Sequence, residues 1–113
     1  VDAGEIETGG IITMTALGDT VTNPKFINIT TGQFFGVTIS MQRDDIITIN
    51  TNKGRKSVKL LRDGAESNLL SDRMAGSEWV QFEAGTNLIG YEAATGTQYL
   101  RVSVTLTQLF EGV

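Results

Sequence analysis

The residues best suited to acid–base or metal chemistry in this sequence are the adjacent carboxylates Asp44 and Asp45. A glycosidase needs two carboxyl groups that converge on one cleft, and a calcium loop needs several oxygen ligands at fixed spacing. Successive side chains of a strand point to opposite faces, so these two acids would not converge within a strand. Their place after Arg43 favours a turn in which the carboxylates cap the main chain.

Other common catalytic groups are missing from the sequence. The chain has no His and no Cys, which removes the commonest general base, the commonest transition-metal ligands and the thiolate nucleophile. It also lacks a Gly-rich phosphate loop, a nucleophile elbow and a dinucleotide fingerprint. We therefore expect no enzyme activity, no catalytic residue, no metal site and no cofactor.

Two aromatic residues are candidates for sugar binding. Trp79 is the only tryptophan, and Tyr91 is one of two tyrosines. A sugar-binding module would expose such rings beside polar groups that reach the sugar hydroxyls. Core packing or partial burial is the interpretation that we favour for Trp79, and sugar stacking by Trp79 and Tyr91 is the alternative.

A basic segment, "NKGRK", surrounds Gly54 and contains Lys53, Arg55 and Lys56. Asn52-Lys53-Gly54 is typical of a tight turn between strands. The simplest interpretation is that these cations decorate a solvated sheet edge and protect it from aggregation. The alternative is a docking patch for an acidic protein partner.

Length and charge exclude other classes of function. The chain has 113 residues, enough for one domain. It has 9 basic and 13 acidic residues, a net charge of −4, which argues against nucleic-acid binding because phosphate must be neutralised by clustered cations. No stretch approaches the ~20 apolar residues of a membrane span, so we expect no membrane insertion.

The elements that must position these residues are predicted to be strands. Thirteen glycines and a single proline punctuate short β-branched and aromatic runs. The clearest run, 99–109, places Leu100, Val102, Val104 and Leu106 on one face, an alternation typical of a half-buried antiparallel strand. About eight strands are expected: 11–17, 26–29, 35–39, 46–49, 57–61, 79–82, 88–91 and 99–109. Only 66–74 could hold a helical turn or two. The sequence predicts an all-β antiparallel sandwich or jelly roll.

The order of several short motifs resembles a known family. The motifs are Gly-x-x-Phe, Asp-x-Ile-x-Ile-Asn-Thr, Lys-Gly-x-x-Ser-Val, a Leu-Leu step, Gly-x-Asn-x-Ile and a terminal Gly-Val. The residues that carry them are Gly32, Phe35, Asp45, Ile47, Ile49, Asn50, Thr51, Lys53, Gly54, Ser57, Val58, Leu69, Leu70, Gly85, Asn87, Ile89, Gly112 and Val113. In this order they resemble the C-terminal domain of phage distal tail proteins, the siphovirus-type tail-component family, over 24–113.

The resemblance implies a galectin-like β-sandwich that follows an N-terminal domain, with 1–9 as a linker remnant and 10–113 as the sandwich. In the family the N-terminal domain forms a hexameric ring at the tip of the tail tube, so the isolated sandwich is expected to be a monomer and the full-length protein a hexamer. The implied function is a structural adaptor of a phage or prophage tail tip, assembled in the bacterial cytoplasm and contacting other tail or baseplate proteins. The alternative is a module that recognises host cell-wall saccharide.

Overall fold

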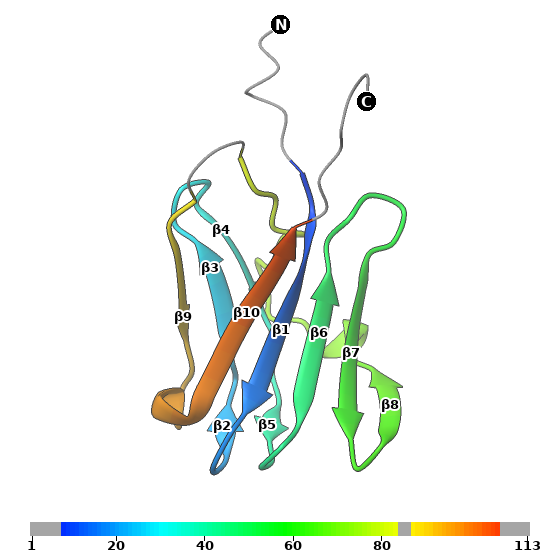
Figure 1. The fold of residues 1–113 in the computed structure, drawn as a ribbon, viewed down its shortest axis with the longest axis vertical. Coiled ribbons are helices and arrows are strands. Elements are labelled where there is room, and N and C mark those ends of the chain that lie inside the picture. The colour runs from blue at the N-terminus through cyan, green and yellow to red at the C-terminus, as the bar shows by residue number, and fades with distance from the viewer. Residues whose placement is uncertain (1–7, 84–86, 107–113) are drawn as a thin grey trace, which may run out of the picture.

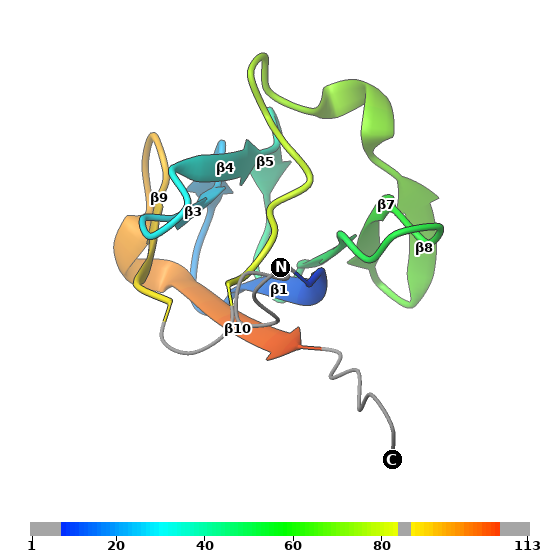
Figure 2. The ribbon, with the colours of Figure 1, turned by 90° about the horizontal axis from the view of Figure 1, so that it is seen from above.

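The computed structural model describes residues 8–83 and 87–106 and folds them into strands arranged in two layers (Figure 1, Figure 2). Within these ranges ten strands are found where about eight were expected, and their pairing is antiparallel throughout. The helical segments within the described ranges are two short 3₁₀ turns, η2 (Leu70–Asp72) and η3 (Thr97–Tyr99). The predicted all-β antiparallel sandwich is therefore confirmed, and its galectin-like character stays a prediction.

The larger layer is a five-stranded sheet in the order β10–β1–β6–β7–β8. Its strands are β1 (Gly10–Ala16), β6 (Ile46–Asn50), β7 (Ser57–Arg62), β8 (Ala65–Asn68) and β10 (Leu100–Leu106). Alternate residues of β1 and β6 are buried, because successive side chains of a strand point to opposite faces and only one face meets the other layer.

The smaller layer contains a three-stranded sheet in the order β4–β3–β9 and a short β2–β5 pair. Its strands are β2 (Val21–Thr22), β3 (Lys25–Asn28), β4 (Gln33–Gly36), β5 (Ser40–Met41) and β9 (Ile89–Glu92). Asn23, whose φ of 52° is left-handed, lies between β2 and β3. Its main-chain N–H donates to Ile39 O at 2.8 Å, and its Oδ1 accepts from Ile39 N at 3.1 Å, so this irregular step stays bonded across the layer.

The core lies between the two layers and is apolar. Its buried residues are Ile12, Met14, Ala16, Val21, Phe26, Phe35, Val37, Met41, Ile47, Ile49, Val58, Leu60, Leu69, Val80, Phe82 and Leu100. Phe26 and Phe82 contribute a tilted ring pair with centroids 6.1 Å apart. Removing this apolar surface from water is the main stabilising contribution to the fold.

The register fixes which turns lie together. Gly10 pairs with Leu106, and Ile11 pairs with Asn50. The start of β1, the end of β10 and the β6–β7 turn therefore lie at one end of the sandwich (Figure 1). The β7–β8 turn and the residues before β6 lie at the opposite end, because Ile46 pairs with both Thr15 and Leu61.

The predicted strand at 79–82 is wrong. This segment belongs to an irregular stretch beside β4, where Met74 N–H donates to Gly36 O at 2.9 Å and Glu78 N–H donates to Phe34 O at 2.8 Å. Only Phe82 forms a bridge, with Thr8. The apolar residues of this stretch fill space between the layers, so their burial produces a strand-like pattern without a ladder.

The helical turns considered for 66–74 are only partly right. Ala65–Asn68 is strand β8, and the helical part is the single turn η2. The chain returns onto β7 because Asp63 and Gly64 both have positive φ, 52° and 79°. This is the requirement of a two-residue type I′ turn, which joins adjacent antiparallel strands. The predicted strand 99–109 corresponds to β10, and 107–109 lie outside the described residues.

Candidate interaction surfaces

The two adjacent acids point to different environments. Asp45 is buried, with 3% of its side chain exposed, whereas Asp44 is exposed and has a φ of 71°. Within 8–83 and 87–106, no group of three or more His, Cys, Asp or Glu residues could hold a metal ion. The Asp44–Asp45 pair therefore does not form a convergent carboxylate site.

Asp45 instead joins three segments at one end of the sandwich. Arg62 donates to it from Nε, at 3.1 and 3.0 Å to the two carboxylate oxygens, and from Nη2 at 2.6 Å to Oδ2. Gln42 N–H donates to Oδ2 at 2.8 Å, and Arg62 Nη2 also reaches Ser40 O at 3.3 Å. β5, the start of β6 and the end of β7 are thereby held together by a charge-assisted network.

The network lowers the pKa of Asp45. Burial by itself disfavours the carboxylate, but the hydrogen bonds from Arg62 and from Gln42 N–H and the positive charge of Arg62 outweigh it, so the pKa lies below its ordinary value. The same contact, chiefly the hydrogen bond to Asp45, raises the pKa of Arg62. Both groups are therefore charged near neutral pH, and their contact stabilises the fold.

The basic turn, defined as Lys53, Arg55 and Lys56, lies at the opposite end. Arg55 N–H donates to Asn52 O at 2.9 Å, and Gly54 has a φ of 80°, the value required at the third position of a type II turn. The three cations are exposed and form no ion pair with another described residue. Their use in docking stays a prediction.

The basic turn is not at a sheet edge, which corrects the simpler interpretation of its charges. β6 and β7 are interior strands, and β8 forms that edge of the five-stranded sheet. Lys59 on β7 contacts Glu66 on β8 at 3.6 Å, with both side chains largely solvated. The cations of the turn therefore project from one end of the sandwich.

Trp79 and Tyr91 are not brought together. Trp79 is half-buried and packs against Phe35 of β4, with ring centroids 5.0 Å apart. Tyr91 is 47% exposed and lies on β9, on the other side of β3. The packing of Trp79 agrees with the favoured interpretation of partial burial. Sugar stacking by either residue stays a prediction, and a platform built from both rings is not present.

The structure shows one surface that the sequence reasoning missed. We call it the β9 edge surface and define it as Ile29, Leu88, Ile89 and Tyr91, which are 53%, 62%, 44% and 47% exposed. Ile29 N–H donates to Leu88 O at 2.8 Å, so the end of β3 and the start of β9 lie side by side at this edge, with Ile29 and Leu88 on the outward face and Ile89 and Tyr91 on the inward face. The sequence contained a signal for an exposed apolar side chain here. Leu88 and Ile89 are adjacent, and adjacent side chains of a strand cannot both face the core of the domain.

A polar network centred on Asn28 holds this edge in place. Asn28, which is fully buried, donates from Nδ2 to Gln81 O at 2.9 Å and to Asn87 Oδ1 at 3.3 Å. Its Oδ1 accepts from Thr30 N–H at 3.0 Å. Thr30 Oγ1 in turn accepts from Leu88 N–H at 2.7 Å. Asn87, one of the motif residues, therefore has a structural role in anchoring β9 to β3.

Comparison with known proteins gave one result. A family model described as "Siphovirus-type tail component, C-terminal domain" matches residues 3–107. Neither the comparison with curated proteins nor the comparison with solved structures found a match. The family match spans both layers of the sandwich, the basic turn and the β9 edge surface, and the chain therefore belongs to the siphovirus-type tail component family, as its C-terminal domain.

Proposed function

We propose that this chain is a structural adaptor domain of a phage or prophage tail tip, acting by protein–protein contact rather than by catalysis. The family match over residues 3–107 is the observation that carries the proposal. The arrangement of charge supports it, because buried Asp45 is paired with Arg62 within the fold while the basic turn is free to meet a partner. The helices of the described residues include none long and apolar enough to span a membrane.

The proposed assembly has the sandwich 10–113 follow an N-terminal domain that forms the hexameric ring, with assembly in the bacterial cytoplasm. The isolated sandwich is then a monomer that presents the basic turn and the β9 edge surface to tail or baseplate neighbours. Sedimentation of the isolated chain tests the first part. A stable hexamer formed by this chain alone would contradict the assignment of ring formation to another domain.

The adaptor function is tested by binding to individual proteins. Each tail-tip and baseplate protein encoded beside this chain would be purified and titrated against the immobilised domain by interferometry. Saturable binding to at least one of them is the expected result. A flat response to all of them, with the domain folded by circular dichroism, would remove the adaptor function.

Saccharide recognition is the second candidate, and the half-exposed ring of Tyr91 is the observation that favours it. Calorimetric titration with cell-wall polysaccharide of the source bacterium would separate the two functions. Saturable heat that disappears in Tyr91→Ala would support a receptor-binding module. Heat that is unchanged in Tyr91→Ala, or no heat at all, would leave the saccharide candidate without its one supporting residue.

A further inference from the structure

We propose that the open edge of β9 accepts an extended segment of a neighbouring tail protein as an added strand. The inference rests on the proposed adaptor function and names the surface and the kind of partner. The β9 edge surface gathers exposed apolar side chains around the end of β3 and along β9, and β9 ends its sheet on that side. Addition of a strand to such an edge is a common mode of peptide recognition.

The main chain of β9 has free hydrogen-bonding groups on this side. In an antiparallel ladder, bonded and non-bonded residue pairs alternate. Ile29 is bonded to Leu88, so the pairs of β3 with Gly90 and Glu92 are bonded as well. The N–H and C=O groups of Ile89 and Tyr91 therefore point away from β3. No described residue forms a main-chain hydrogen bond with them there.

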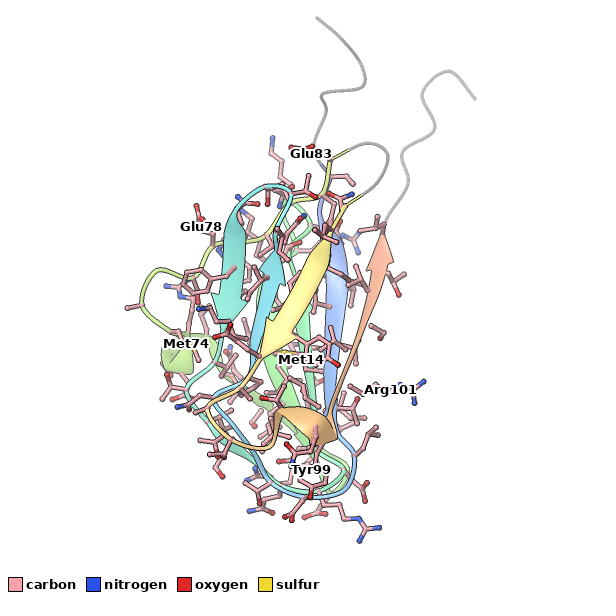
Figure 3. The ribbon with its side chains drawn as sticks, turned by 90° about the vertical axis from the view of Figure 1, so that its left-hand side faces the viewer. Met14, Met74, Glu78, Glu83, Tyr99 and Arg101 are labelled. Atoms are coloured by element: carbon pink, nitrogen blue, oxygen red, sulfur yellow. The ribbon has the colours of Figure 1, made fainter. Side chains whose placement is uncertain are left out.

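The side chains beside this edge are apolar and partly uncovered. Ile89 and Tyr91 pair with Asn28 and Phe26, whose side chains face the core, so they share the inward face of the smaller layer. Val102 and Val104 of β10 face the same interior and are only half-buried. Figure 3 shows β9 and β10 as the two strands on this side of the sandwich, and no ladder joins them. An added strand on β9 would cover these side chains.

The edge strand β8 of the five-stranded sheet is protected from pairing in a way that β9 is not. β8 has the sequence Ala-Glu-Ser-Asn, is exposed along its whole length and carries the Lys59–Glu66 contact. Charged and polar residues of this kind discourage pairing with another chain. β9, with the sequence Ile-Gly-Tyr-Glu, instead has two large apolar side chains and carries its one charge at its end. Its edge is therefore open to an extended backbone.

The occupant favoured by these observations is a segment of another protein rather than a second copy of this chain. β9 has four residues, about 13 Å of strand, which is too short to supply the roughly 800 Å² per partner of a stable interface. Each copy also carries a net charge of −4. The exposed acids Glu83 and Glu92 lie near the two ends of this edge and have no ion pair with a described residue. A segment with alternating apolar residues and a flanking Lys or Arg complements this surface.

The test uses overlapping synthetic peptides that cover the tail-tip and baseplate proteins encoded beside this chain, measured by fluorescence anisotropy. We expect one alternating apolar peptide to bind. N-methylation at every second residue should weaken binding about tenfold for each lost hydrogen bond of the edge, while N-methylation at the intervening residues should have little effect. This period-two pattern requires no change in the protein.

Two variants test the same edge from the protein side. Ile89→Pro removes an outward N–H and leaves the bonds to β3 intact, which is the position where an edge strand tolerates proline. Tyr91→Lys introduces a charge of the kind that protects natural edges. Both should abolish peptide binding. Leu61→Lys, at a 39% exposed site on interior strand β7, is the matched control and should bind as wild type.

Each outcome decides the proposal. Binding that is equal in wild type, Ile89→Pro and Tyr91→Lys would overturn it, as would peptide binding without the period-two pattern. A dimer in sedimentation that is lost in Tyr91→Lys would show that a second copy of this chain occupies the edge, and it would also overturn the proposal. If a whole tail protein binds but no peptide does, and Tyr91→Lys has no effect, the adaptor function stands and the edge proposal falls. If no tail protein binds, the adaptor function fails first.

Discussion

β6 runs between two turns that carry charged residues, and the two turns use their charge differently. At its start, Asp45 is buried and bonded to Arg62. At its end, Lys53 and its neighbours in the basic turn are exposed and form no ion pair with another described residue. The difference teaches that net charge near a turn says little about binding, because a charge already committed to the fold cannot also recruit a partner.

The largest effect expected from this comparison is that of Asp45→Ala. It leaves Arg62 and Gln42 N–H without their acceptor, and we expect a loss of about 2–3 kcal/mol in the free energy of unfolding. The loss is at the lower end for a buried pair because Arg62 is 34% exposed and can reach water. Urea unfolding measures it. Asp72→Ala, at an exposed acid, is the control and should change stability by less than about 0.5 kcal/mol.

The second effect is a dependence of the free energy of unfolding on pH in the acid range. The pKa of Asp45 is lowered in the folded state, so its contribution is fully present above the unfolded value of about 3.9. It is lost as the pH falls through the folded pKa. Wild type and Asp45→Asn should differ by a constant amount above about pH 5 and converge below pH 4. A constant difference down to pH 2 would mean that Asp45 titrates alike in both states.

A smaller effect is expected from Arg62→Lys. The variant keeps the charge but loses the two-nitrogen contact with Asp45 that Nε and Nη2 provide. We expect a loss of about 1 kcal/mol in urea unfolding. If Arg62→Lys were as destabilising as Asp45→Ala, the geometry of the guanidinium, rather than the pairing of charge, would be the main stabilising contribution.

The smallest effect on stability is expected at the basic turn. Replacing Lys53, Arg55 and Lys56 together with serine should change the free energy of unfolding by less than about 0.5 kcal/mol, because none of them forms an ion pair with a described residue. If the turn docks an acidic partner, the same variant should slow association and reduce its dependence on salt. A large loss of stability would instead assign these cations to the fold.

Much of the fold could be predicted from local patterns. The alternation in 99–109 and 11–17 corresponds to β10 and β1, because each strand buries one face only. Asp63-Gly64 is a local pattern of the same kind, because a two-residue turn with positive φ at both positions requires such residue types. The strand β8 could not be found in this way. Its residues are all exposed, with no large apolar side chain among them, and it exists because the turn returns it onto β7.

The candidate surfaces were harder to predict because they depend on which strands end a sheet. The basic turn looked like an edge until β8 was placed beside β7. Sugar stacking by both Trp79 and Tyr91 was the alternative to burial of Trp79, but β3 separates the packing site of Trp79 from β9. The openness of β9 follows from strand order, a property set by contacts distant in sequence that no local pattern reports.

The pairing of Gly10 with Leu106 has a mechanical consequence. A tension applied between these two residues would peel β1 from β10 one pair at a time, starting at that end. A tension applied between Gly10 and the β7–β8 turn, at the opposite end of the sandwich, would instead act along β1 and load all of its bonds to β6 together. A domain held at residue 10 and pulled from its far end would therefore resist more force than the same domain pulled from its two neighbouring strand ends.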